Sequence, residues 1–202
     1  MRRYTLILCI CISLLIPGVL ALDVPDTEDA SEEDNFKAIA LYNEASDLAY
    51  AGEFDTALEK VNEALAIIPN FTLALTTKAA ILSEFEQYGE ALEVLQAAYD
   101  LNPGDPYILS NAASIYILVG EYEYALEIID KALSYAPDMV EIWIAKGTAH
   151  GALGEYEQEI AASEEALRLD PDNEFALYNL NYAQEQIEKS VDENDPVEAI
   201  VS

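Results

Sequence analysis

Four evenly spaced prolines constrain the fold of this chain more than any other feature: Pro69, Pro103, Pro137 and Pro171. Between them, apolar residues recur at helical spacing on both sides of a short break, as at 119–121. A proline ends a helix because it cannot continue the hydrogen-bond ladder and keeps the preceding residue out of helical geometry. The spacing therefore predicts an all-α chain built from repeated pairs of short helices.

Small residues occupy equivalent positions in successive units, where the two helices of a pair are expected to cross. Their three columns are Ala45, Ala79, Ala113 and Gly147; Ala57, Ala91 and Ala125; and Ala64, Ala98, Ala132 and Ala166. Bulky residues form two further columns, Leu41, Leu75, Leu109 and Trp143, and Phe54, Tyr88, Tyr122 and Tyr156. One pair cannot bury its apolar face alone, so neighbouring pairs must stack to form a continuous core.

These features resemble the tetratricopeptide repeat (TPR) family, with its 34-residue unit, Gly-x-Tyr at the turn, alanines at the helix crossing and a final proline. The resemblance implies a right-handed TPR superhelix, an α-solenoid of four helix-turn-helix repeats. The repeats would span 38–71, 72–105, 106–139 and 140–173, and residues 174–189 would form a C-terminal capping helix. It also implies a concave groove lined by the first helix of each pair.

Residues 1–21 have the pattern of a secretory signal peptide. Arg2 and Arg3 precede an apolar run from Leu6 to Ile16, and small residues end the segment. We expect cleavage after Ala21, with retention of the segment as a signal anchor as the open alternative. In both cases the repeats would be extracytoplasmic, either secreted or in the cell envelope. Both cysteines lie in this segment, so the cleaved protein would have no thiol chemistry.

Acidic segments flank the predicted repeats. Residues 22–36 are expected to form a disordered acidic linker, because they contain many carboxylates and almost nothing to bury. Asp34 or Asn35 would then cap a helix that begins near Phe36. Residues 190–202 are predicted to be a frayed acidic tail.

The overall charge of the chain excludes one class of partner. It has 9 basic and 39 acidic residues, for a net charge of −30. Such a surface repels phosphate backbones and anionic membranes, so we expect no nucleic acid binding and no membrane contact beyond an uncleaved signal segment. Whether the acidity keeps the protein soluble or attracts a basic partner stays open.

The TPR resemblance implies a peptide-binding groove on the first helices and the capping helix. The groove residues carried over are Tyr42, Asn43, Ser46, Thr76, Tyr107, Ser110, Asn111, Ser114, Thr148, Tyr178, Asn179 and Tyr182. No lysine or arginine is among them, which argues against the carboxylate-clamp type of TPR. Amides and tyrosines suit an extended, neutral or basic protein segment.

The resemblance therefore predicts an exported scaffold for protein–protein interaction that is monomeric by itself. The alternative is a structural module that assembles an envelope complex through end-to-end or convex-face contacts.

The fourth unit places polar residues where the other units have apolar ones: His150, Glu159 and Ser163. The three types could form a hydrolase relay, but a helix crossing offers neither a substrate pocket nor oxyanion donors. We therefore expect a structural polar cluster in which Glu159 accepts a hydrogen bond from His150, since burying an unpaired carboxylate is costly. With no phosphate loop or metal-ligand cluster in the sequence, we predict no enzyme, no cofactor and no metal.

Overall fold

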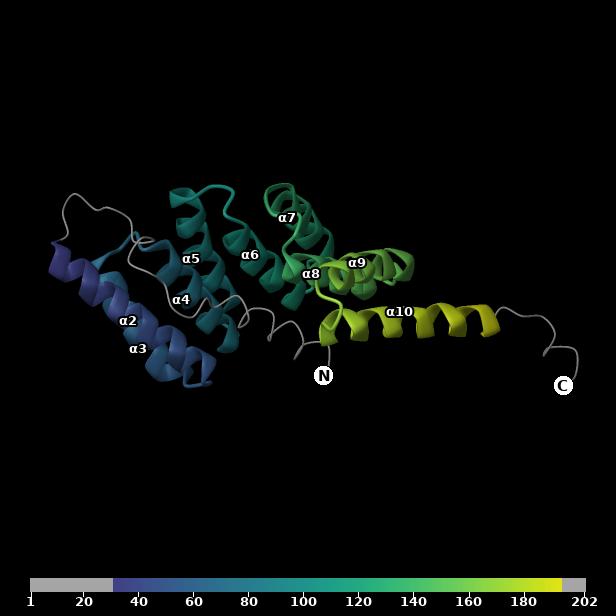
Figure 1. The fold of residues 1–202 in the computed structure, drawn as a ribbon, viewed down its shortest axis with the longest axis horizontal. Coiled ribbons are helices and arrows are strands. Elements are labelled where there is room, and N and C mark those ends of the chain that lie inside the picture. Colours follow the sequence, from purple (N-terminus) through teal and green to yellow (C-terminus); the bar gives the residue numbers. More distant parts are fainter. Residues whose placement is uncertain (1–30, 194–202) are drawn as a thin grey trace, which may run out of the picture.

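The computed structural model describes residues 31–193. The predicted signal segment, residues 22–30 of the linker and residues 194–202 of the tail lie outside the described residues. Within 31–193 the chain forms helices and no strand (Figure 1). The helices are α2 (Glu32–Tyr50), α3 (Phe54–Ile67), α4 (Thr72–Glu84), α5 (Tyr88–Leu101), α6 (Pro106–Leu118), α7 (Tyr122–Tyr135), α8 (Val140–Leu153), α9 (Tyr156–Leu169) and α10 (Glu174–Glu193).

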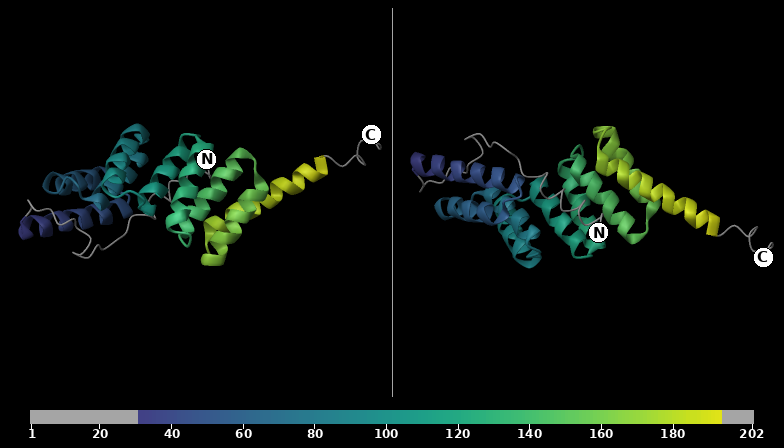
Figure 2. Two further views of the ribbon diagram at one scale, coloured as in Figure 1. Left: turned by 90° about the horizontal axis from the view of Figure 1, so that it is seen from above. Right: turned by 90° about the horizontal axis from the view of Figure 1, so that it is seen from below.

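Helices α2 to α9 form four successive pairs, and each pair packs against the next along an elongated stack (Figures 1 and 2). The second helices begin at equivalent positions of successive repeats, at Phe54, Tyr88, Tyr122 and Tyr156. Helix α10 continues the stack by packing against α8 and α9. The predicted all-α helical-repeat solenoid is confirmed. No helix in residues 31–193 is both long and apolar enough to span a bilayer.

The repeated prolines follow the second helix of each pair. These helices end two residues before a proline, at Ile67, Leu101, Tyr135 and Leu169. The missing N–H of the proline and its effect on the preceding residue account for the common end point.

Helix α2 begins earlier than we expected. Its N-cap is Ser31, whose hydroxyl accepts a hydrogen bond from the backbone N–H of Asp34 at 3.2 Å, while the Asp34 carboxylate accepts from the Ser31 N–H at 3.4 Å. This reciprocal capping box starts the helix at Glu32, so residues 32–36 belong to α2 and not to a linker. At the other end, α10 continues past residue 189, so Ser190 to Glu193 are helical and not part of the tail.

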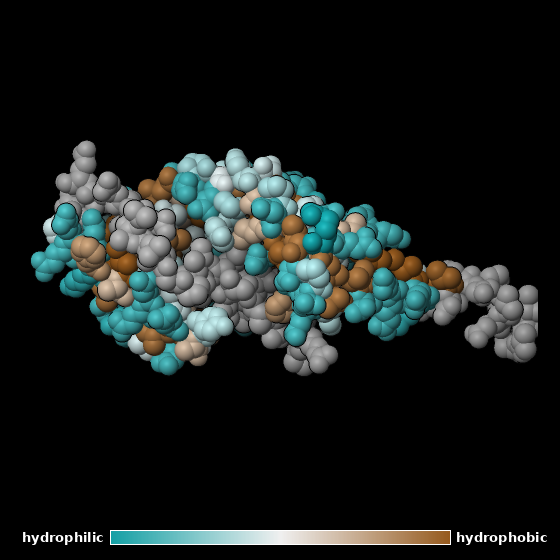
Figure 3. All heavy atoms as spheres, viewed as in Figure 1, coloured by the Kyte–Doolittle hydropathy of each residue, from teal (hydrophilic) through white to brown (hydrophobic). Residues whose placement is uncertain are grey.

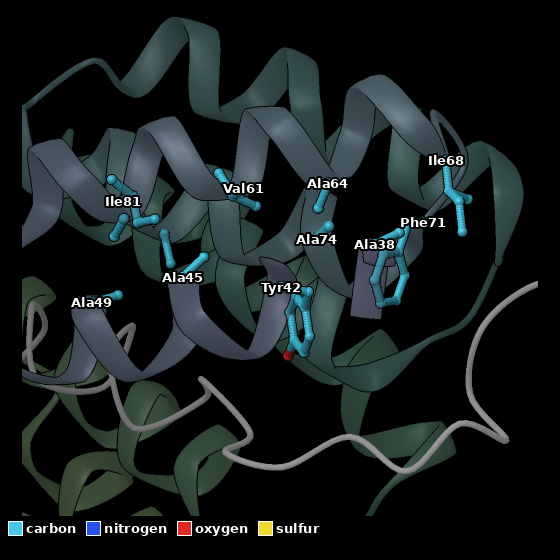
Figure 4. Close-up of a cluster of buried hydrophobic side chains, with 12 residues drawn as sticks. Ala38, Tyr42, Ala45, Ala49, Val61, Ala64, Ile68, Phe71, Ala74 and Ile81 are labelled. Atoms are coloured by element: carbon cyan, nitrogen blue, oxygen red, sulfur yellow. The ribbon is translucent and has the colours of Figure 1, made fainter. Parts of the chain in front are cut away.

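The columns of small residues form the centre of the core. Ala57, Ala91 and Ala125 are completely buried, and their small side chains allow the two helices of a pair to approach closely. Figure 4 shows the core around the first pair, where alanines of α2 and Ala64 of α3 belong to one buried cluster and the ring of Tyr42 lies near Phe71. The sequence prediction of where the helices cross is consistent with this burial.

The turns within the pairs require a left-handed backbone at one position. Gly52, Gly120 and Gly154 have φ values of 81°, 86° and 77°, but the equivalent residue of the second pair is Glu86, with φ 58°. In each turn the following N–H donates to a carbonyl in the last turn of the preceding helix, as from Gln87 to Leu82 at 2.9 Å. The second turn therefore keeps the same geometry with a less suitable residue.

We predict that Glu86→Gly stabilises the protein by about 1 kcal/mol, because a residue with a Cβ is strained in the left-handed region and glycine is not. Urea denaturation would measure the change. Gly120→Ala is the matched control: its new Cβ would meet nothing within 4 Å, so it should cost a similar amount through φ alone. Equal stability of all three proteins would show that this strain is negligible.

Candidate functional site

The predicted groove residues of the third unit lie on one face of α6. Tyr107, Ser110, Asn111 and Ser114 recur at spacings of three and four residues, which places them on one side of a helix. Tyr107 is exposed, whereas the other three are buried. This face combines an aromatic ring at one end with a row of hydroxyl and amide groups.

Several polar atoms of this face make no hydrogen bond within the described residues. They are the hydroxyl oxygens of Ser110 and Ser114 and the side-chain carbonyl oxygen of Asn111. The Asn111 amide nitrogen is used, since it donates to the Tyr107 carbonyl at 3.0 Å. The side-chain oxygen of Asn43, on α2, also makes no hydrogen bond within the described residues. Unused hydrogen-bonding groups in a buried position cost free energy, and a ligand reaches these atoms only where the side chains that cover them move aside.

Other predicted groove residues serve the packing of the solenoid. Tyr42 is 1% exposed and its ring centroid lies 5.1 Å from that of Phe71, within the core of the first pair. The Thr76 hydroxyl donates to the Leu73 carbonyl at 2.9 Å, within its own helix. Ser46 is also buried. Tyr42 and Thr76 therefore have structural roles that the sequence did not reveal.

The capping helix is attached to the fourth pair by a polar contact. Asn179 donates from its amide nitrogen to the Thr148 hydroxyl at 3.1 Å, and that hydroxyl donates to the Ile144 carbonyl at 3.0 Å. Both side chains are buried. On the same helix, Tyr178 and Tyr182 stack with ring centroids 6.3 Å apart. Asn179 and Thr148 thus join two helices, and the two tyrosines provide the partly exposed aromatic surface beside them.

The polar residues of the fourth unit are arranged differently from our hypothesis. His150 Nδ1 lies 2.7 Å from the Glu155 carboxylate, so the observed partner of His150 is Glu155, where we expected Glu159. The turn at Gly154 places Glu155 next to the last turn of α8, because the Glu155 N–H donates to the His150 carbonyl at 3.0 Å. Ser163 donates its hydroxyl proton to the backbone carbonyl of Glu159 at 2.7 Å. These bonds do not form the side-chain relay that a serine hydrolase uses.

Gly151, which the sequence reasoning missed, makes room for the buried Glu159 side chain. A Cβ on Gly151 would lie 2.2 Å from the Glu159 Oε2 atom, and Glu159 is completely buried. In the other three units, the residues equivalent to Gly151 are larger: Ala49, Ser83 and Ile117. The sequence does contain a signal for this contact: Gly151 occurs in the same unit in which Glu159 replaces the alanine at the helix crossing.

We predict that Gly151→Ala destabilises the fold by about 1–3 kcal/mol, because the added methyl overlaps a carboxylate that cannot move into solvent. The same substitution in a Glu159→Ala background should cost at least about 1 kcal/mol less, because the overlap is gone. Thermal or urea unfolding of the four proteins of this cycle measures the coupling. Additive effects of the two substitutions would contradict the packing argument.

Glu84, in the last turn of α4, carries a partly buried carboxyl group that the sequence analysis also missed. Burial raises the pKa of its carboxyl group from 4.5 to about 7. Its Oε1 atom has no hydrogen-bond partner in residues 31–193. The equivalent residues of the other units are Tyr50, Leu118 and Ala152, so the carboxylate stands where apolar or aromatic side chains are the rule.

The raised pKa gives a prediction for pH dependence. An acid with a raised folded-state pKa destabilises the fold when it is ionised, so the cost is absent below about pH 4.5 and complete above about pH 7. Glu84→Gln should therefore stabilise the protein at pH 8 by about 1 kcal/mol, a value reduced because the carboxyl is half exposed. The gain should vanish near pH 4. Glu93→Gln, at an exposed position of α5, is the control and should show no such difference.

The described residues hold no group of three or more His, Cys, Asp or Glu side chains arranged to bind a metal ion.

Sequence comparisons support the repeat structure seen above. Three family models, each described as tetratricopeptide repeat, match residues 42–106, 82–149 and 140–173. No curated protein sequence matches the chain.

Solved structures with the same fold include TTC0263, a thermophilic TPR protein in Thermus thermophilus, with a TM-score of 0.67 and 22% identity over 76% of this chain and 84% of that one. The structure of MamA from residue 41 to its end, from Desulfovibrio magneticus RS-1, has a TM-score of 0.63 and 20% identity, over 78% of this chain and 90% of that one. The structure of the first TPR of Spaghetti (RPAP3) bound to the HSP90 peptide SRMEEVD has a TM-score of 0.55 and 23% identity, over 58% of this chain and 93% of that one. At these identities the likeness establishes the fold.

Proposed function

Because this chain belongs to the tetratricopeptide repeat family, whose members generally mediate protein–protein interaction, we propose that it binds an extended protein segment along the face of its first helices. In this proposal it acts as a non-enzymatic scaffold. The segment lies across α2, α4 and α6, and its backbone exchanges hydrogen bonds with the side chains of the groove.

The observation that carries the proposal is the set of unused polar atoms on α6 and α2. The hydroxyl oxygens of Ser110 and Ser114 and the amide oxygens of Asn43 and Asn111 can all accept a hydrogen bond, and none of them does so within residues 31–193. A backbone in extended conformation presents N–H groups at regular intervals, so it can supply several of these bonds at once where the side chains that cover these buried atoms move aside. A globular partner with few free backbone groups would satisfy fewer of them.

The charge of the chain favours a neutral or basic segment. The net charge is −30, and none of the twelve predicted groove residues is a lysine or arginine. The surface in Figure 3 shows hydrophilic residues over much of the visible face. A basic segment would be attracted by this field, whereas a peptide like the one named for Spaghetti, with its consecutive glutamates, would be repelled.

Other features support the proposed location and assembly state. The apolar N-terminal segment supports export, so the partner would be extracytoplasmic. A chain that uses its inner face for a foreign segment should itself be monomeric, and sedimentation that changes with concentration would favour an assembly role.

We predict that the full chain binds heptapeptides from an array in the order basic, neutral, acidic. The double variant Asn43→Ala/Asn111→Ala should bind the best peptide about tenfold more weakly, because it loses two hydrogen bonds of about 0.5–1.5 kcal/mol each. Asn62→Ala, at an exposed position of α3, is the matched control and should bind as the unmodified protein does. Fluorescence anisotropy with the labelled peptide measures the affinities. Undiminished binding by the double variant, or a preference for acidic peptides, would contradict the proposal.

A further inference from the structure

The opposite face of α6 forms part of a pocket of about 320 Å³ between α5 and α7, here called the outer pocket. Ile108, Leu109, Ala112 and Tyr116 line it from α6. On a helix of 3.6 residues per turn, these positions point away from Ser110, Asn111 and Ser114. The outer pocket is therefore separate from the proposed groove.

A comparison of two equivalent joints between repeats explains why the outer pocket exists. Between the third and fourth units, Lys146 extends across the joint, pairs with Asp130 at 2.7 Å and lies over the ring of Trp143 at 5.5 Å. One repeat earlier in the chain, the equivalents of Lys146 and Asp130 are Ala112 and Gln96, and both line the outer pocket. A long side chain fills one joint, whereas a methyl group leaves the other open.

The walls of the outer pocket suit a flat apolar group. Leu95, Ile108 and Leu109 are buried and form its apolar interior. The rings of Tyr116 and Tyr124 meet edge to face at the wall, with centroids 4.6 Å apart. The volume lies at the lower end of the range of about 300–1,000 Å³ that is usual for small-molecule sites. It is enough for one aromatic ring with a short chain.

The rim of the outer pocket carries a cation without a carboxylate partner. Lys131 donates a hydrogen bond to the Tyr99 hydroxyl, and its ammonium lies 4.7 Å from the centroid of that ring. No ion pair joins Lys131 to a carboxylate among residues 31–193, in a chain with 39 acids and 9 bases. Glu127 is the one acidic residue of the lining, and it is exposed at the rim.

These two groups can bind a carboxylate together. The ammonium has three protons and uses one on Tyr99, while the tyrosine hydroxyl accepts that bond and keeps its own proton to donate. Both donors can therefore reach one carboxylate, and bonds of this charge-assisted kind are the stronger ones. The single charge of Lys131 next to Glu127 fits a monoanion better than a dianion.

We propose that the outer pocket binds a small aromatic monocarboxylate, with its ring against Tyr116, Tyr124 and the apolar interior and its carboxylate on Lys131 and Tyr99. The ligand occupies a space equivalent to the one that the Lys146 side chain fills between the third and fourth units. The proposal does not depend on the inner groove.

The test is a titration of the full chain with phenylbutyrate at low ionic strength, followed by calorimetry and by the NMR shifts of the tyrosine rings. Phenylbutanol, which keeps the ring and chain, should bind at least tenfold more weakly, because it loses the charge-assisted bonds. Phenylbutylamine should bind more weakly still. Saturation should move the resonances of Tyr116 and Tyr124.

Two variants locate the site. Lys131→Met keeps the length of the side chain and should weaken phenylbutyrate binding about tenfold, whereas Lys189→Met, on α10, should leave it unchanged. Ala112→Met should fill the outer pocket and abolish binding. Lys131 is exposed, so its variant folds even if the Ala112 variant does not. Equal affinity for the acid and the alcohol, undiminished binding by Lys131→Met, or no saturable binding would each overturn the proposal.

Discussion

The close approach of helix backbones at the columns of small residues is the constraint on which the rest of the structure depends. Ala57, Ala91 and Ala125 are completely buried in the second helices of the first three pairs, so each contributes only a methyl group to the contact between the two helices. This fixes the distance and the angle within each pair, and the same geometry repeated in every unit produces the stack. Larger side chains are thereby displaced to the two faces of each helix, where they form either packing between units or surfaces for ligands.

The fourth unit shows how the constraint is maintained when one column changes. Glu159 stands where the other units have alanine, and its side chain takes up space at the crossing. The glycine at 151 on the facing helix returns that space. The polar group is thus accommodated by a second substitution in the same unit, which is the pattern expected of a dense core in which volume at one position must be matched at its neighbour.

Departures from exact repetition also create the candidate sites. A perfect repeat would treat every joint alike, but Lys146 closes one joint and Ala112 leaves the equivalent one open. On the face of α6 away from the outer pocket, Ser110, Asn111 and Ser114 gather polar groups on a single helix. Helix α4 offers mainly threonines at the predicted groove positions, and the Thr76 hydroxyl is bonded to its own helix backbone. The two faces of α6 therefore have different chemistry, one with amides and hydroxyls and the other with aromatic rings and a lysine.

The sequence by itself determined the period, the helix pairs, their ends at the prolines and the crossing columns, because these depend on local propensity and on spacing along the chain. The first turn of α2 was also encoded in it, although we overlooked the Ser31 capping box. Only the tertiary structure decided that Tyr42 packs in the core, that His150 pairs with Glu155 and that Ala112 opens a pocket. Those outcomes depend on which side chains of neighbouring helices and turns meet in space, and a periodic pattern in one dimension does not specify the volumes and directions that meet there.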